Sequence, residues 1–219
     1  MTPSTPRESL CGLRARKKQR TRDALIRAAL ELFTAQGYEA TTVDEIAAAV
    51  DVSQRTFFRY FSNKEEVTFA AQEMVEARFL EELRRRPADE APLTALHSSV
   101  MAAWDDVAAS IEPIIPVELH MRVYQMIEST PALLAAHMQR SCGLEEEVAR
   151  MLARREGLDV DRDPRPRVLV GAFNGVMRAA GKAWSEGDDF TVTSIRELTR
   201  SYLDHIGPAL DDDWHTARG

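Results

Sequence analysis

The sequence predicts an all-α protein, and three observations support this fold class. Apolar residues recur at helical spacing in nearly every segment of the 219-residue chain. No run alternates apolar and polar residues between turn residues for long enough to indicate a β-strand. Two capping-box patterns, Thr42-Val-Asp-Glu45 and Ser62-Asn-Lys-Glu65, mark helix starts near the N-terminus. We therefore expect a small N-terminal group of helices followed by a larger helical body.

The composition is that of an ordinary globular protein, with 44% hydrophobic and 29% charged residues. No apolar run approaches the roughly 18 residues that span a membrane. The N-terminus also lacks the apolar core of a signal peptide. The chain has only two cysteines, Cys11 and Cys142, which favours a reducing compartment over a disulfide framework. We therefore expect a cytoplasmic protein.

Charge is distributed unevenly along the chain. Residues 1–64 contain 11 Lys+Arg and 7 Asp+Glu, or +4, and residues 65–219 contain 17 and 28, or −11, which together give the net charge of −7. The densest positive run extends from Arg14 to Arg22. A basic N-terminal part on an acidic body fits contact with nucleic acid, and it fits a solvated basic tail equally well.

The chain before the first capping box predicts a tail and one long helix. Residues 1–16 contain prolines and a glycine and show no apolar period, so we expect a disordered tail there. A helix is predicted from about Thr21 to Gln36, because apolar residues repeat at helical spacing up to Gly37, which provides a C-terminal stop.

Two short helices and a tight turn follow. Thr42 is expected to cap a helix over 43–50, and Ser53 a helix over 54–60, with Asp51 in the turn between them. Two short helices joined in this way are typical of a helix-turn-helix.

A fourth helix is expected to begin at the capping box of Ser62 and to end near Arg86, before Pro87. Proline, glycine and polar breaks then divide the rest of the chain. Further helices are predicted near 91–110, 115–127, 131–155, 165–186 and 191–211.

The aromatic and basic stretch RTFFRYF predicts one helix with two different faces. Phe57 and Phe61 are four residues apart and share the face that we assign to the core. Gln54 and Arg55 lie at the N-terminal end, where a helix in the major groove contacts bases, and these side chains suit adenine and guanine. The residues that we expect to contact DNA are Arg20, Thr42, Ser53, Gln54, Arg55, Thr56, Phe58, Arg59, Tyr60 and Lys64.

The stretch ALIRAALELFTAQGYEATTVDEIAAAVDVSQRTFFRYFSNKEEV resembles the N-terminal DNA-binding domain of the TetR/AcrR family of transcriptional regulators. It carries the A-x-x-L-F-x-x-x-G-[YF], T-T-V-x-x-I-A and V-S-x-x-T-F-[YF]-x-Y-F-x-x-K-E patterns, within about residues 20–70. The resemblance implies a cytoplasmic homodimer that binds a palindromic double-stranded DNA operator. It also implies that a small ligand in the body changes the distance between the two DNA-binding domains.

Two residues depart from the family pattern. Phe58 replaces a Tyr whose hydroxyl contacts phosphate in many relatives, so we expect Phe58 to pack against sugar instead. Asp51 replaces a turn Gly, so it must adopt the left-handed conformation, which Asp tolerates better than most residues.

A stripe of small residues predicts the dimer interface. Gly171 and Gly175 lie inside a predicted helix, where each Gly costs about 1 kcal/mol relative to Ala, and close approach of another helix is the usual compensation. We expect a four-helix bundle between two subunits, while packing within one subunit remains the alternative. The interface residues predicted are Gly171, Gly175, Ala179, Ile195, Leu198 and Tyr202.

Methionines and aromatics in the body suit an adaptable apolar pocket, although a plain core uses the same residues. The candidate pocket residues are Met101, Trp104, Met121, Tyr124, Met126, Phe173 and Met177. The stretches ESTPAL and DPRPRVLVGAF are similar to the family branch whose bodies are described as acyl-CoA-like ligand-binding domains. Arg122 and Arg178 are then candidates for the phosphates of such a ligand.

No catalytic, metal or cofactor site is predicted. The chain has no Gly-rich phosphate loop and no nucleophile motif, and its histidines lack metal spacing. We therefore expect a ligand-responsive dimeric repressor, with a DNA-binding domain over 17–64, a helical ligand-binding and dimerisation domain over 65–212, and disordered tails over 1–16 and 213–219. The alternative is a small-molecule binding module or enzyme without sequence-specific DNA recognition, and activation fits the residues as well as repression does.

Overall fold

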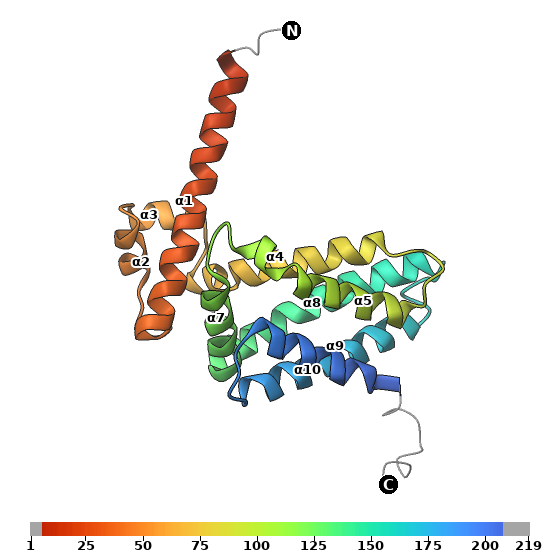
Figure 1. The fold of residues 1–219 in the computed structure, drawn as a ribbon. Coiled ribbons are helices and arrows are strands. Elements are labelled where there is room, and N and C mark those ends of the chain that lie inside the picture. The colour runs from red at the N-terminus through yellow and green to blue at the C-terminus, as the bar shows by residue number, and fades with distance from the viewer. Residues whose placement is uncertain (1–5, 208–219) are drawn as a thin grey trace. The chain divides into compact units, whose positions relative to one another are not determined.

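The computed structural model describes residues 6–207 of the chain, and the side chains of residues 14–207. All regular structure in this range is helical, which confirms the all-α prediction. The helices are α1 (Pro6–Gln36), α2 (Val43–Ala49), α3 (Gln54–Phe57), α4 (Lys64–Arg85), α5 (Pro92–Asp105), α6 (Val107–Ile111), α7 (Val117–Ser129), α8 (Pro131–Arg155), α9 (Arg165–Ser185) and α10 (Val192–Asp204) (Figure 1).

The start of α1 differs from the expectation of a disordered tail over residues 1–16. The helix begins at Pro6, ten residues before the predicted tail ends. Proline suits the first turn of a helix, and the Arg, Lys, Gln and Leu residues that follow are good helix formers. Because they continue a helix that already exists, they add turns without a new nucleation step.

The cap of α4 lies one residue later than predicted. Asn63, not Ser62, is the cap, because its Oδ1 accepts a hydrogen bond from the Glu66 amide at 2.7 Å. The Glu66 carboxylate in turn accepts from the Ser62 amide at 2.6 Å. The pair is therefore Asn63 and Glu66, since the helix begins at Lys64 and the capping residue must precede its first turn.

The helix predicted over 91–110 is broken at Asp106, which separates α5 from α6. The Asp106 backbone lies outside helical geometry, at φ −105° and ψ 7°, and its carboxylate forms an ion pair with Arg78 of α4 at 2.8 Å. The residue at which the helix breaks, Asp106, is thus also the residue that pairs with α4. At the other end of the body, α10 ends at Asp204, and the last predicted residues, 208–211, lie outside the described range together with the predicted tail 213–219.

The chain divides into two compact units. The first unit contains residues 1–73 and 111–123, and the second contains residues 74–110 and 124–219. Two helices, α4 and α7, therefore begin in the first unit and continue into the second. These two helices therefore connect the units covalently.

Each unit has its own hydrophobic core. In the first unit, α1 packs on α2 and α2 on α3, and Phe33, Ile46 and Phe57 are at most 1% exposed. In the second unit, α9 packs against α5, α8 and α10. Phe79 and Phe173 stack there, with ring centres 6.3 Å apart.

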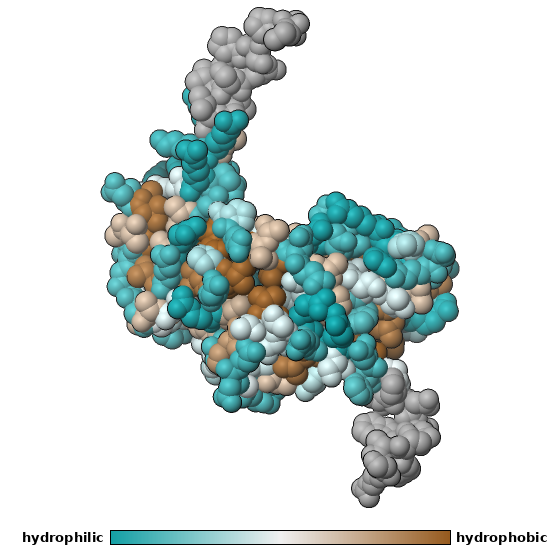
Figure 2. All heavy atoms as spheres, viewed as in Figure 1, coloured by the Kyte–Doolittle hydropathy of each residue, from teal (hydrophilic) through white to brown (hydrophobic). Residues whose placement is uncertain are grey.

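Hydrophilic residues cover most of the face drawn in Figure 2, and apolar residues appear on it as small separate patches. Among the helices that the structure describes, none combines the length and the apolar composition of a membrane span.

Candidate nucleic-acid interface and effector site

The start of α2 is held by the predicted capping box. The Thr42 hydroxyl accepts from the Glu45 amide at 3.2 Å, and the Glu45 carboxylate accepts from the Thr42 amide at 2.8 Å. Hydrogen bonds from the backbone and the side chain of Thr42 hold the pKa of Glu45 below its usual value. The Thr42 hydroxyl also donates to the Glu45 carboxylate at 2.9 Å. It therefore has both a donor and an acceptor partner within the protein.

The turn between α2 and α3 depends on Asp51, whose φ is +54°. This confirms the left-handed conformation predicted for a residue in place of glycine. The turn lets the Val52 amide donate to the Ala47 carbonyl at 3.0 Å, which closes the end of α2.

The start of α3 is capped by Ser53, whose hydroxyl accepts from the Thr56 amide at 3.2 Å. The Thr56 hydroxyl lies 3.0 Å from that of Ser53, so these two predicted DNA contacts are also partners of each other. The regular helix covers only Gln54–Phe57, and turns that continue its backbone bonds carry the chain to Phe61. We call Gln54–Phe61 the recognition segment.

The recognition segment has a buried and an exposed side, as predicted. Phe57 and Phe61 are 0% and 2% exposed, and their ring centres lie 5.7 Å apart. Phe58 is 50% exposed, and Gln54, Arg55 and Arg59 are exposed around it. The structure thus places the half-exposed ring of Phe58 among polar side chains. This combination suits contact with bases and sugars.

Tyr60 and Arg59 form a pair at the end of the segment. The Arg59 guanidinium lies 5.1 Å from the centre of the Tyr60 ring, and its Nη2 donates to the Tyr60 hydroxyl at 3.4 Å. Both groups remain accessible at the surface, so they can contact phosphates together.

Lys64 has a different environment from the one that we expected. Its Nζ donates to the carbonyls of Tyr38 at 2.8 Å, Thr41 at 3.2 Å and Glu39 at 3.4 Å. It also lies 4.3 Å from the centre of the Tyr38 ring, whose pKa burial raises to about 12, so the phenol stays neutral. The three ammonium hydrogens are therefore used within the protein, and Lys64 fastens the start of α4 to the loop before α2.

Arg20 and Arg22 lie on different sides of α1. Arg20 is exposed, whereas the Arg22 guanidinium lies 5.3 Å from the centre of the Phe61 ring. Residues two positions apart point about 200° from each other around a helix. The structure therefore groups Arg22, which the sequence prediction omitted, with the recognition segment, and it does not group Arg20 with it.

An aromatic cluster in the second unit contains two of the predicted pocket residues. The Tyr124 ring centre lies 6.5 Å from that of Trp104 and 5.3 Å from that of Trp184. The indole nitrogens of both tryptophans are buried and have no hydrogen-bond acceptor among the described residues. The pocket residues predicted from the sequence do not include Trp184, because helical spacing alone does not show that its N–H lacks a partner.

The other predicted pocket residues occupy several places. Met101 and Phe173 are buried and belong to the core around Phe79, and Met177 is partly buried against that core. Met126 is partly buried in the second unit, whereas Met121 belongs to the first unit, where it is 3% exposed.

Gly181 allows the closest contact in the aromatic cluster. A Cβ atom at this position would lie 2.9 Å from the Tyr124 hydroxyl and 3.8 Å from a carboxylate oxygen of Glu128. Burial raises the pKa of Glu128 and also raises that of Tyr124. A polar edge thus lies beside the aromatic rings.

The predicted dimer residues divide into exposed and buried groups. Gly171 and Ala179 are exposed, and a Cβ built on Gly171 meets no atom within 4 Å. Close packing within the chain is therefore not the reason for a glycine at position 171. Ile195, in contrast, is 1% exposed and belongs to the core of its own chain, which corrects its assignment to the interface. Tyr202 is 36% exposed and Leu198 is partly buried.

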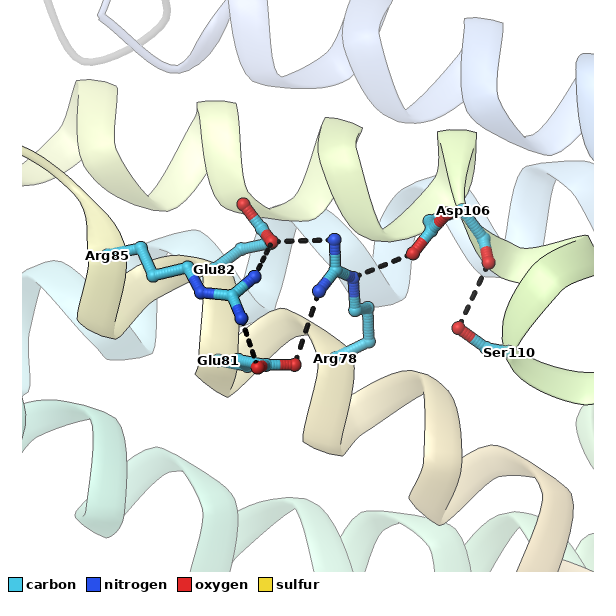
Figure 3. Close-up of polar contacts among 6 residues, drawn as sticks. All are labelled: Arg78, Glu81, Glu82, Arg85, Asp106 and Ser110. Atoms are coloured by element: carbon cyan, nitrogen blue, oxygen red, sulfur yellow. Dashed lines mark hydrogen bonds and ion pairs between the residues drawn. The ribbon is translucent and has the colours of Figure 1, made fainter.

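An ion-pair cluster connects α4 with the break between α5 and α6. Figure 3 shows Arg78 between the carboxylates of Glu81 and Glu82 on its own helix and that of Asp106. The neighbouring residue Asp105 pairs with Arg196 of α10, with Nε and Oδ1 2.5 Å apart. Trp104, Asp105 and Asp106 are thus consecutive residues whose partners lie on α7, α10 and α4.

Replacement of Lys64 by Met tests its internal role. Loss of the ammonium leaves the partly buried carbonyls of Tyr38 and Thr41 without this donor, which costs about 1–3 kcal/mol. We expect a lower melting temperature and weaker binding to all DNA sequences, with an unchanged slope of log K against log salt concentration. A direct phosphate contact would instead reduce that slope by about 0.9. Arg27→Met, which removes an exposed cation from α1, is the control.

Replacement of Gly181 by Ala tests the Tyr124 contact. The added methyl group meets the Tyr124 hydroxyl, so we expect a loss of stability of about 1–3 kcal/mol in thermal unfolding. Gly143→Ala in α8 is the matched control, because a Cβ there meets nothing within 4 Å and alanine favours the helix. Equal stabilisation by both substitutions would exclude a close contact at Gly181.

The chain is similar to known regulators along almost its whole length. Residues 25–71 match the model "Bacterial regulatory proteins, tetR family", and residues 90–210 match the model "MftR C-terminal domain". The HTH-type transcriptional regulator TcmR of Streptomyces glaucescens is 44% identical over 213 residues, which cover 97% of this chain and 93% of TcmR.

Two solved structures share the fold at low sequence identity. NalD, the secondary repressor of the MexAB-OprM multidrug efflux pump in Pseudomonas aeruginosa, is 19% identical with a TM-score of 0.59, over 90% of this chain and 99% of NalD. FadR of Thermus thermophilus, solved in complex with lauroyl-CoA, is 23% identical with a TM-score of 0.56, over 90% of this chain and 99% of FadR. The chain therefore belongs to the TetR family of bacterial regulatory proteins, and it is a transcriptional regulator and not an enzyme.

Proposed function

We propose that this regulator is a homodimeric repressor, which a small-molecule effector releases from a palindromic operator. The observation that carries the proposal is the recognition segment, which buries Phe57 and Phe61 and exposes Gln54, Arg55 and Phe58. Arg55 matches the acceptors of guanine and Gln54 those of adenine, at the end of the segment that enters a major groove. In this proposal residues 17–64 form the DNA-binding domain and residues 65–212 form the effector and dimerisation domain.

Dimerisation through α9 supports the palindromic target. Gly171, Ala179 and Val168 lie along α9, and Val168 is 68% exposed. Two exposed glycine or alanine positions let a second helix approach closely, and Val168 supplies apolar area for it to bury. A two-fold dimer built on this face presents two recognition segments to two half-sites.

An acyl-CoA is the effector class that we propose. FadR of Thermus thermophilus, which has the same fold, binds lauroyl-CoA. In this chain, Trp104 and Trp184 offer aromatic surface for an apolar chain and two indole N–H groups for a polar atom, such as a thioester carbonyl. The Arg178 side chain is half-exposed, and its contact with the Glu145 carboxylate is long, at 4.0 Å. Its guanidinium is therefore available to a phosphate.

The effector signal travels, in this proposal, through the break between α5 and α6. A ligand that moves Trp104 also moves Asp106 two residues later, and Asp106 is paired with Arg78. Arg78 belongs to α4, which starts directly after the recognition segment. A shift of α4 therefore reaches the DNA-binding residues along one continuous helix.

The first experiment is a selection of bound fragments from random DNA with the purified full-length protein. We expect a palindrome, whose half-site spacing reports the distance between the two recognition segments. Arg55→Ala should then relax the preference at one base position of each half-site, at a cost of about 1–3 kcal/mol. Arg27→Ala is the control, and a motif that remains sharp in Arg55→Ala would exclude Arg55 as a base contact.

The route through Arg78 is tested with lauroyl-CoA as the probe. Arg78→Met should bind the operator and lauroyl-CoA like the wild type in titrations, but lauroyl-CoA should release it less effectively. Arg162→Met, which breaks an exposed ion pair with Asp159, is the matched control. If lauroyl-CoA releases Arg78→Met from the operator as effectively as it releases the wild type, this route is excluded. If the wild type neither binds lauroyl-CoA nor is released by it, lauroyl-CoA is excluded as the effector.

A further inference from the structure

We propose that residues 14–20, which we call the α1 extension, bind DNA through the side of the helix that carries Arg14 and Lys18, and that this side contacts the phosphate backbone beside the bases read by the recognition segment. This inference rests on the proposed operator-binding function. It assigns a role to a part of α1 that belongs to no core among the described residues.

The α1 extension continues a basic row that starts at the recognition segment. Arg14, Lys18 and Arg22 are spaced by four residues, so their side chains lie along one side of the helix. The row ends at Arg22, whose guanidinium lies 5.3 Å from the centre of the Phe61 ring. At about 1.5 Å per residue, the three cations cover about 12 Å along the helix axis.

The cations of the α1 extension are free to bind a partner. Every residue from Arg14 to Arg20 is exposed, and no ion pair involves this stretch in the part of the chain that the structure describes. Arginines of the second unit behave differently, as in the pairs Arg84–Glu147 and Arg167–Glu146, both 2.9 Å long. In Figure 2 the part of α1 that adjoins the grey atoms is mainly hydrophilic on the visible face.

A partner would also stabilise the helical state of the α1 extension. A helix gains most of its stability from packing on other elements, and every side chain of this stretch is exposed. Like charges four residues apart, as in Arg14 and Lys18, destabilise a helix further. A polyanion beside the row would remove this repulsion, so DNA is expected to stabilise the helix that it binds.

The width of the α1 extension excludes the minor groove as its target, and its Arg and Lys side chains suit phosphates. A helix with side chains is about 10–12 Å wide, whereas the minor groove is only about 6 Å wide, so the helix does not fit inside that groove. Contacts from Arg and Lys to phosphates fix position and add affinity without reading sequence. The extension should therefore strengthen binding to DNA that flanks each half-site, whatever its sequence.

The test compares two charge-matched double variants. Arg14→Gln/Lys18→Gln removes two cations from the row, and Arg16→Gln/Arg27→Gln removes two exposed cations from the other side of the same helix. Glutamine keeps the helix propensity of both pairs nearly unchanged, and circular dichroism checks this. Binding to the selected operator, with and without flanking base pairs, is measured by fluorescence anisotropy over a range of salt concentrations.

We expect Arg14→Gln/Lys18→Gln to reduce the magnitude of the slope of log K against log salt concentration by about 3.6, since the dimer loses four phosphate contacts and each contributes about 0.9. The selected motif should not change, and the control pair should keep the wild-type slope. In the wild type, the amides of residues 14–20 should exchange hydrogen more slowly on flanked operator than on the bare palindrome.

Equal slopes for the two double variants would overturn the proposal, because the effect would then come from net charge alone. The proposal would also be overturned if the amides of residues 14–20 exchanged hydrogen at the same rate on flanked operator and on the bare palindrome. Either result leaves the proposed function intact as long as the wild type selects a palindrome. A folded wild type that selects no DNA would instead contradict the proposed function, and this inference with it.

Discussion

Burial of Phe57 and Phe61 is the constraint on which the DNA-binding side of this protein depends. Full burial of a phenylalanine side chain contributes about 1.5–3 kcal/mol, and these two rings are 0% and 2% exposed. Because they share one side of the recognition segment, their burial fixes its rotation and turns Arg55 and Phe58 outward. A regular helix of 4 residues has no stability of its own that could hold this orientation. Core packing therefore orients the residues that we propose as DNA contacts.

Polar contacts around the recognition segment then limit its movement. Asp51 sets the turn before it, Ser53 caps its start, and Asn63 caps the helix that follows. Lys64 closes this arrangement, since its ammonium ties the start of α4 to carbonyls in the loop before α2. A shift of α4 would consequently act on both ends of the helix-turn-helix, as the proposed route through Arg78 requires.

The two units use their arginines differently, and this division gives the acidic protein a DNA-binding surface. In the second unit many arginines pair with carboxylates, as Arg78 does with Glu82 and Asp106. Exposed ion pairs of this kind contribute only about 0–1 kcal/mol each to stability, and they neutralise the cations that take part in them. Arg14, Lys18 and Arg55 lack such partners among the described residues, and residues 1–64 carry +4 against −11 for the rest.

The sequence by itself determined the features that depend on neighbours within about four positions. Helices α8 and α9, the caps at Thr42 and Ser53, and the left-handed Asp51 all follow from local spacing and backbone preference. Tertiary structure decided the rest. The Lys64 ammonium binds carbonyls 23 to 26 residues away, Gly181 meets Tyr124 of another helix, and Ile195 is buried although its spacing matched the predicted interface. Periodicity shows which residues share one face of a helix, but only packing decides which of these faces another element covers.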